Sequence, residues 1–287
     1  MKSMNILLTN DDGIHAPGIA ALHNALTDES HPDGPLGEIF TVAPASAQSA
    51  TSHGITYHIP LMVERTTINN QPALAVEGRP ADCSKLALTN LYPEHHGQGA
   101  RPDLVISGMN AGANCGINVI YSGTVAAAIE AAFIGVPAIA VSLHLDSNSS
   151  TQSSTQNGTQ DPTQHPDWNR AAKAARKTID TLLQTGLPNQ HEVLSINIPA
   201  TQYLNDDTKA VVCPMNTHAL VDQYEQRATP KNNAYYWSTA HGLEFRSTDQ
   251  GTDVHELFER NITITPLSYD LTNHNRLAFW NDRINNT

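Results

Sequence analysis

Two adjacent acidic residues near the N-terminus, Asp11 and Asp12, have the types and spacing that metal chemistry uses. Adjacent carboxylates repel each other unless a positive group neutralises them. A hard divalent cation such as Mg²⁺ or Mn²⁺ neutralises them by taking oxygen ligands. The alternative is a solvated turn, in which Asp residues beside a glycine such as Gly13 are common. From the acidic pair alone, both interpretations stay open.

The residues on either side of the pair predict where it lies. Residues 6–8 form a short apolar run with the character of a buried strand. Pro17 stands where a first helical residue would, before a helix expected over 18–26. In open α/β sheets, ligands bind outside the carboxyl ends of the strands. We therefore expect the acidic pair at the edge of a sheet where such folds bind ligands.

A glycine-rich loop follows another expected strand, over 104–106, and carries Asn110 and Asn114. An Asn side chain can offer its carbonyl oxygen to a hard cation or its amide to a phosphate, or it can simply build the turn. The loop is not the dinucleotide pattern G-x-G-x-x-G, because its glycines fall four residues apart, and it lacks the Lys-Ser/Thr of a P-loop. The three roles for the asparagines stay open.

An alanine-rich helix is expected from about residue 122 to Gly135 and Pro137, which stop it. Ser122 or Thr124 can cap its start. The free N–H groups of such a first turn also suit an anion. Capping alone explains the hydroxyl groups about as well as anion binding does.

Length, charge and cysteine content narrow the class of protein. A chain of 287 residues can bury a sizeable core, and its net charge of −12 argues against a nucleic-acid polymer as partner. No apolar run approaches the ~20 residues of a membrane span, and no signal peptide is evident. The three cysteines are too widely spaced for a disulfide framework or a zinc finger. We expect a cytoplasmic protein that does not enter a membrane.

Further elements are expected along the chain. Asp82 is expected to cap a helix over 83–91, a second helix is expected over 169–184, and residues 146–167 read as a flexible low-complexity insertion. An aromatic patch at 235–237 suits hairpin packing or a partner subunit better than a stacked base. A terminal helix is expected over 271–284. The remaining β segments are expected over 38–43, 55–63, 73–76, 138–143, 193–198, 209–213, 234–237 and 261–265.

Three blocks together resemble the SurE family, the survival-protein 5′-nucleotidases. They are Asn10-Asp-Asp-Gly-Ile with Ala16-Pro-Gly-Ile, Ser107-Gly-Met-Asn-Ala-Gly with Asn114, and Tyr121-Ser-Gly-Thr-Val-Ala-Ala-Ala. Weaker matches continue in the same order along nearly the whole chain. The resemblance implies an α/β fold, Rossmann-like and three-layered (α/β/α), with a C-terminal β-hairpin and helix extension. It implies a catalytic domain over 1–200 and an extension over 201–287 that builds a dimer or tetramer.

The resemblance also implies a metal-dependent phosphomonoesterase that acts on nucleoside 5′-monophosphates, with 3′-monophosphates and short polyphosphate as further substrates to consider. Family members place one divalent ion, Mn²⁺ or Mg²⁺, on residues that correspond here to Asp11, Asp12, Ser49 and Asn110. Ser46 and Ser52 are rival hydroxyls in the same loop. The segment 213–218 lacks two arginines that the family often carries, which bears on substrate preference and assembly.

Within this reading, Asp12 is the expected acceptor of the proton from an attacking water. The phosphate is expected on Asn114, on Ser107 with the backbone N–H groups of the Gly108–Gly116 loop, and on the helix start at Gly123–Thr124. Three alternatives remain: a covalent aspartyl-phosphate route through Asp11, a non-catalytic metal- and nucleotide-binding regulator, and a metal-dependent glycosyltransferase.

Overall fold

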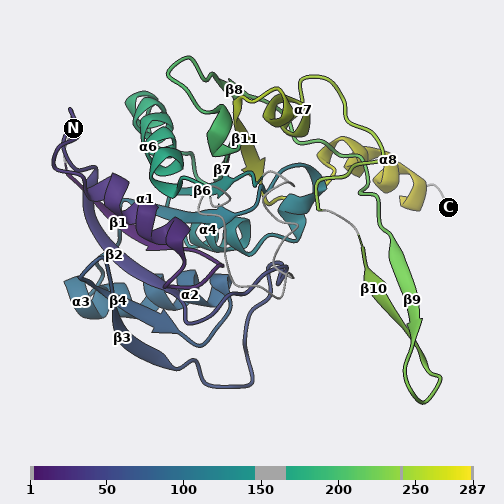
Figure 1. Ribbon diagram of the computed structural model, residues 1–287, viewed down its shortest axis with the longest axis horizontal. Helices are drawn as coiled ribbons and strands as arrows, with labels where there is room; N and C mark the ends of the chain where they lie inside the picture. The colour runs from purple at the N-terminus through teal and green to yellow at the C-terminus, as the bar shows by residue number, and fades with distance from the viewer. Residues whose placement is uncertain (1–2, 146–165, 240–241, 286–287) are drawn as a thin grey trace, which may run out of the picture.

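The computed structural model describes residues 3–145, 166–239 and 242–285 (Figure 1). The expected insertion at 146–167 therefore lies outside the described residues, apart from its last two positions. The strands are β1 (Met4–Thr9), β2 (Gly37–Pro44), β3 (Val63–Ile68), β4 (Gln71–Val76), β5 (Leu104–Ala111), β6 (Ala138–Leu143), β7 (Glu192–Ile198), β8 (Ala210–Val212), β9 (Tyr224–Ala228), β10 (Ala234–Ser238) and β11 (Ile262–Ser268). The α-helices are α1 (Pro17–Thr27), α2 (Pro80–Leu86), α3 (Tyr92–His96), α4 (Gly123–Phe133), α6 (Trp168–Thr185), α7 (Asp253–Phe258) and α8 (His274–Asn285).

The central sheet has the strand order β3-β4-β2-β1-β5-β6-β7-β11-β8. The six strands from β4 to β7 in this order are mutually parallel. From β1 the chain builds outward through β2 to β4, and then returns to β5 and builds the other way through β6 to β7. The carboxyl ends of β1 and β5 therefore flank the topological switch point, where open α/β sheets bind ligands.

Helices cover both faces of the sheet, so the expected three-layer α/β fold is confirmed (Figure 1). On one face α1 packs beside α6, and on the other α2 packs beside α4. Each face of the sheet has its own hydrophobic core. Because side chains alternate along β1, Ile6 and Leu8 belong to one core and Leu7 belongs to the other. In the described part of the chain, no helix has the length and apolar character needed to cross a membrane.

Most expected elements are confirmed within a few residues, but the strand expected over 55–63 is wrong. Its aromatic and aliphatic side chains face solvent, with Tyr57 76% and Ile59 68% exposed. Pro60 lacks the N–H that a ladder needs. The strand β3 begins only at Val63 and pairs antiparallel with β4.

The expected cap of the second helix is also wrong. Asp82 is the third residue of α2, because Pro80 takes the first helical position and Arg79 is the N-cap. The Asp82 carboxylate accepts the Arg79 N–H at 2.9 Å and the Thr56 hydroxyl at 2.7 Å. The helix expected over 83–91 starts earlier, as α2, and continues through a π-helical turn (Ala87–Leu91) into α3.

The C-terminal part of the chain adds strands to the central sheet and also forms a projecting hairpin and a terminal helix. The strand β11 pairs antiparallel with β7, and β8 pairs with β11, so the central sheet continues into this part. The antiparallel hairpin β9–β10 instead projects away from the body, and α8 lies on the same side of the molecule (Figure 1).

Candidate active site

A cavity of about 350 Å³ opens at the switch point, beyond the carboxyl ends of β1 and β5. The pairing of Thr9 with Ser107 brings the loops that follow these two strands side by side. The cavity is lined by the acidic pair and by predicted residues from two further loops: Asp11, Asp12, Ser49, Asn110 and Asn114. Residues separated by up to about a hundred positions in sequence thus face one space.

Asp11 is the more deeply buried of the two acids, with 5% of its surface exposed. Its Oδ1 accepts a hydrogen bond from the hydroxyl of Thr124, and its backbone oxygen accepts the N–H of Gln48 at 2.7 Å. Burial, with a further contribution from the charge of Asp12, raises the pKa of Asp11 to about 6. A carboxylate in this environment is stabilised when a cation sits beside it.

Asp12 is fixed by the backbone of the neighbouring loop. The N–H of Ala111, at the end of β5, donates to Oδ2 of Asp12 at 2.7 Å. Burial raises the pKa of Asp12 as well. Gly13 takes a φ of +98°, which closes the acidic turn, and its oxygen accepts the side-chain amide of Asn10 at 2.8 Å.

The two asparagines of the glycine-rich loop have different surroundings. The amide Nδ2 of Asn110 donates to the oxygen of Gly112 at 2.6 Å, so Oδ1 is the Asn110 atom that can coordinate a cation. The Nδ2 of Asn114 donates to Ser142 at 2.8 Å, and its backbone N–H donates to Asn197 at 2.7 Å. Asn114 is thereby tied to β6 and β7 at the wall of the cavity.

The loop after β2 contains three serines, and their hydroxyl groups have different surroundings. Ser49 lines the acidic cavity. The hydroxyl of Ser52 instead donates to the oxygen of Ile120 at 2.8 Å. Ser46 lines a different hollow, on the other side of Asp12. Among the three hydroxyls, Ser49 is thus the one that faces the cavity.

Four other predicted residues are not among those that line the cavity. Ser107 and Gly108 are buried in β5. Gly123 and Thr124 lie behind the acidic pair, where Thr124 holds Asp11 and a Cβ added at Gly123 would come within 2.9 Å of the Asp11 Cβ. Ser122 caps α4 by accepting the N–H of Val125 at 3.1 Å. The side chains at the start of α4 therefore position a carboxylate.

Sequence reasoning missed several residues of the cavity wall, among them Asn118, Tyr121 and His144. His144 directly follows β6, one of the parallel strands. Its place at the carboxyl end of an expected strand is the signal that could have found it. Tyr121 begins one of the blocks that resemble the family, which is the signal that could have found it, whereas Asn118, in the turn before α4, has no such signal.

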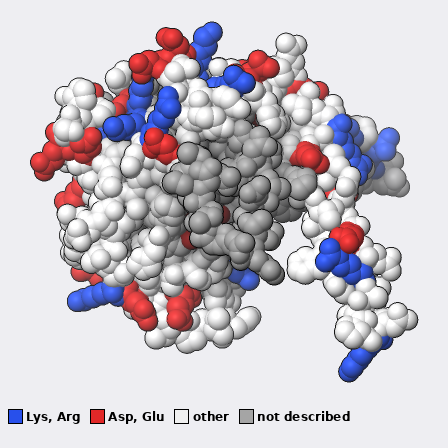
Figure 2. Space-filling view, in the orientation of Figure 1, with Lys and Arg blue, Asp and Glu red and all other residues white. Residues whose placement is uncertain are grey.

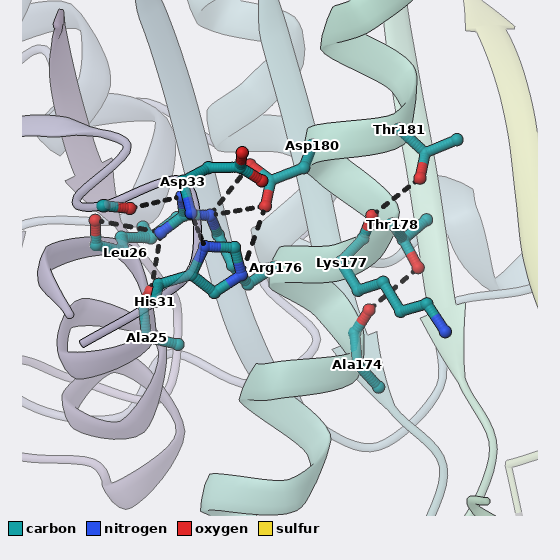
Figure 3. Close-up of polar contacts among 11 residues, drawn as sticks. Ala25, Leu26, His31, Asp33, Ala174, Arg176, Lys177, Thr178, Asp180 and Thr181 are labelled. Carbon is teal, nitrogen blue, oxygen red and sulfur yellow. Dashed lines mark hydrogen bonds and ion pairs between the residues drawn. The ribbon is translucent and has the colours of Figure 1, made fainter. Parts of the chain in front are cut away.

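The donor set at the cavity fits a hard divalent ion. Two carboxylates with raised pKa values, an amide oxygen and a hydroxyl are the oxygen ligands that Mg²⁺ and Mn²⁺ take. A second group of candidate ligands, His31, Asp33 and Asp180, has ligating atoms within 4.8 Å of one another (Figure 3).

Arg176 already neutralises that second group. Its Nε donates to both carboxylate oxygens of Asp180, at 2.8 and 2.9 Å, and its other nitrogens bind backbone oxygens of α1 and the following loop (Figure 3). His31 and Asp33 also lie in the connection from α1 to the amino end of β2, whereas the acidic cavity lies at the carboxyl ends of the parallel strands. The geometry of the second group is that of a clamp between α1 and α6.

A doubly covered, mostly parallel sheet with an oxygen-lined acidic cavity at its switch point defines an α/β protein with a candidate ligand site of the kind that open α/β sheets carry. The family model described as "Survival protein SurE" matches residues 6–222 of the chain. The protein belongs to this family.

Relatives and a solved structure agree with the family model. The chain is 39% identical to the 5′-nucleotidase SurE of Rhodopirellula baltica, over 97% of this chain and 98% of the relative. It is 36% identical to the 5′-nucleotidase SurE of Carboxydothermus hydrogenoformans, over 96% of both chains. The crystal structure of the SurE protein from Aquifex aeolicus superposes with a TM-score of 0.74 at 29% identity, covering 98% of this chain and 99% of that one.

Proposed function

We propose that the protein is a divalent-metal-dependent 5′-nucleotidase, which hydrolyses nucleoside 5′-monophosphates to nucleoside and phosphate. One observation carries the proposal: Asp11, Asp12, Ser49 and Asn110 line a single cavity at the switch point. The relatives that match nearly the full chain are named for the same activity. Nothing in this set of relatives favours a non-catalytic regulator on the same fold.

Asp11, Asp12, Asn110 Oδ1 and Ser49 would hold one Mn²⁺ or Mg²⁺ ion. Bound there, the ion supplies Lewis-acid polarisation of the phosphoryl group and lowers the pKa of a water. Thr124 and Ala111 keep the two carboxylates in place through their hydrogen bonds. The oxygen of Asp12 that Ala111 does not hold, Oδ1, accepts the proton from the attacking water.

Phosphoryl transfer mainly needs positioning and charge neutralisation. We assign the positioning to Asn114, which lines the cavity, and to the N-terminal end of α4, which begins directly after the lining residue Ser122. Since α4 is eleven residues long, its aligned peptide dipoles favour negative charge at this end. Charge on the phosphate is thus neutralised without a lysine or arginine in the cavity wall that the structure describes.

The proposal is tested by phosphate release from a panel of nucleoside 5′- and 3′-monophosphates and short polyphosphate, with Mn²⁺, Mg²⁺ or Ca²⁺. We expect release from 5′-monophosphates with Mn²⁺ or Mg²⁺, loss on chelation, and a fall of at least about a thousandfold in kcat for Asp11→Asn and Asp12→Asn. Retained activity in folded Asp11→Asn protein would contradict the metal site. An acid-labile phosphoenzyme would favour the covalent route through Asp11. Release only from a sugar nucleotide would point to a glycosyltransferase.

We further propose that residues 201–287 assemble the protein into a homodimer or homotetramer through the hairpin and α8. A lone two-stranded hairpin is marginally stable in water, yet β9–β10 projects with every residue exposed. No residue of α8 is buried in the described chain, although the helix carries Leu277 and Trp280. A cytoplasmic location is in keeping with three free, buried cysteines.

A further inference from the structure

A second hollow, of about 360 Å³, adjoins the catalytic cavity. The two share Asp12 and Ala111, which are joined by the 2.7 Å hydrogen bond from the Ala111 N–H to Asp12 Oδ2. The acidic turn therefore forms a partition between them. A ligand whose phosphate lies at the acidic pair has this hollow as its immediate neighbour.

The linings of the two spaces differ in chemistry. The catalytic cavity has two carboxylates and three asparagines, which suit a cation, a phosphate and hydroxyl groups. The second hollow has the indole of Trp168 together with small or apolar residues such as Ala16, Pro17 and Ala45, and its polar members besides the shared Asp12 are His15 and Ser46. An apolar space with an aromatic wall suits a flat ring rather than a charged group.

Trp168 is held rigidly as the first residue of α6. Asp167 caps that helix by accepting the N–H of Arg170 at 2.9 Å, and its own N–H donates to the Thr201 hydroxyl at 3.2 Å. The half-buried indole packs against Gly18 of α1, where an added Cβ would lie 2.9 Å from Trp168 Cζ3. The absence of a side chain at Gly18 thus lets the ring settle against α1 with one part still facing the hollow.

We propose that this second hollow binds the nucleobase of the substrate, with Trp168 as the stacking residue that determines specificity for nucleotides over other phosphate esters. The inference rests on the proposed nucleotidase activity. Stacking on an aromatic side chain tolerates every base, because each base has a π-face. The site therefore selects for a base without strongly ranking the four nucleotides.

The kinetic test compares AMP with ribose 5-phosphate, which lacks the base. We expect Trp168→Leu to raise the ratio of the AMP KM to the ribose 5-phosphate KM about tenfold, and Trp168→Phe to restore most of it. The matched control is Trp237→Phe on the hairpin, which should leave the ratio as in the wild type. A rise of this ratio in Tyr121→Leu but not in Trp168→Leu would place the base in the catalytic cavity and overturn the proposal.

A binding test needs no catalysis. The chain has three tryptophans, so Trp237→Phe with Trp280→Phe leaves Trp168 as the only one. We expect adenosine to quench its fluorescence saturably, without metal, and ribose 5-phosphate to leave it unchanged. Unchanged fluorescence with adenosine at millimolar concentration overturns the proposal. If no phosphate ester is hydrolysed with any metal, the nucleotidase proposal fails, while the adenosine titration still decides whether the hollow binds a base.

Discussion

The hydroxyl of Thr124, on α4, donates a hydrogen bond to Oδ1 of Asp11, 113 positions earlier in the chain. Both side chains are almost completely buried. The contact joins the helix that follows η2 (Gly116–Ile120) to the acidic turn after β1. One of the proposed metal ligands thus has its orientation set by the opposite half of the sheet.

Removing this hydroxyl should weaken the metal site more than the fold. We expect Thr124→Val to raise the Kd for Mn²⁺ about tenfold, because a hydrogen bond to a charged group contributes about 1.5 kcal/mol. Thr124→Ser keeps the hydroxyl and is the matched control. Calorimetric titration with Mn²⁺ measures both. Equal affinities for the Val and Ser variants would show that the contact does not orient Asp11.

Substitutions of the glycines at the two ends of α4 can distinguish an effect on catalytic activity from an effect on the stability of the fold. A Cβ at Gly123 would lie 2.9 Å from Asp11 Cβ, 3.0 Å from its Oδ2 and 2.9 Å from Pro80 Cγ on the other side, so Gly123→Ala should displace the carboxylate. We expect phosphate release to fall at least about tenfold, as expected for a misplaced catalytic group.

Gly135, just beyond the other end of α4, provides the comparison. It has open space but a φ of +84°, so Gly135→Ala should destabilise the fold by about 1 kcal/mol and leave kcat unchanged in folded protein. Thermal unfolding and steady-state kinetics measure the two effects. If kcat fell in both variants in proportion to the loss of free energy of unfolding, this prediction would be wrong.

A buried carboxylate on α4 makes stability depend on pH. Burial alone would raise the pKa of Glu130, but hydrogen bonds from His53 and Lys85, at 2.8 and 3.1 Å, hold it below its ordinary value of 4.5. A carboxylate whose pKa is lower in the folded state stabilises the fold above pH 4.5, and this stabilisation is lost as the pH falls through the folded value.

We therefore expect Glu130→Gln to lower the free energy of unfolding by about 2 kcal/mol at neutral pH, and the difference from wild type to shrink below pH 4.5. Lys85→Met should cost less, since the lysine side chain is 49% exposed. Urea unfolding across the pH range measures both. A difference that is constant with pH would mean that the ion pair is not its cause.

Because Arg176 forms an ion pair with Asp180, we expect the metal to bind at the acidic cavity and not at the group of His31, Asp33 and Asp180 (Figure 3). His31→Ala should leave the Mn²⁺ titration and the Mn²⁺ activation as in wild type, because Arg176 already neutralises Asp180. Arg176→Met should lower stability by about 3–5 kcal/mol, as when one partner of a buried ion pair is removed. Loss of Mn²⁺ binding in His31→Ala but not in Asp11→Asn would reverse this assignment.

The projecting hairpin predicts assembly through aromatic side chains. Tyr236 and Trp237 are 61% and 58% exposed. Figure 2 shows acidic and basic side chains scattered over the visible face, while most of the hairpin is uncharged. We expect the double variant Tyr236→Ser, Trp237→Ser to elute as a monomer in light-scattering chromatography. Phe133→Ser, at a 47% exposed aromatic away from the hairpin, is the control that should keep the oligomer.

Local patterns in the sequence predicted the strands, turns and helices near the site, because these features depend on neighbouring residues. Even the missed strand β3 had a local signal. Asn69 and Asn70, which join it to β4, have φ values of 50° and 64°, as a type I′ hairpin turn requires. The apolar residues just before β3 led to the wrong strand prediction over 55–63. They are exposed in the structure, and an apolar pattern in the sequence does not show whether its side chains face the core or the solvent.

The contacts that complete the site could not be predicted in this way. The bond from the Ala111 N–H to Asp12 spans 99 positions, and the strand that carries Ala111 has a register shift between Ser107 and Asn110 in the pairing of β5 with β6. Local sequence holds no information on such a shift. The family resemblance supplied the candidate ligands, whereas the structure supplied what holds them.

The pairing of β11 with β7 bears on how the protein is made. During synthesis the six parallel strands are complete at Ile198, but the strand that covers the edge of β7 is complete only at Ser268. Until then the nascent sheet presents an unpaired edge, which is the surface through which chains aggregate. Ribosomes that stall in this interval would release aggregation-prone fragments, and a chaperone that shields the open edge would raise the yield of folded protein.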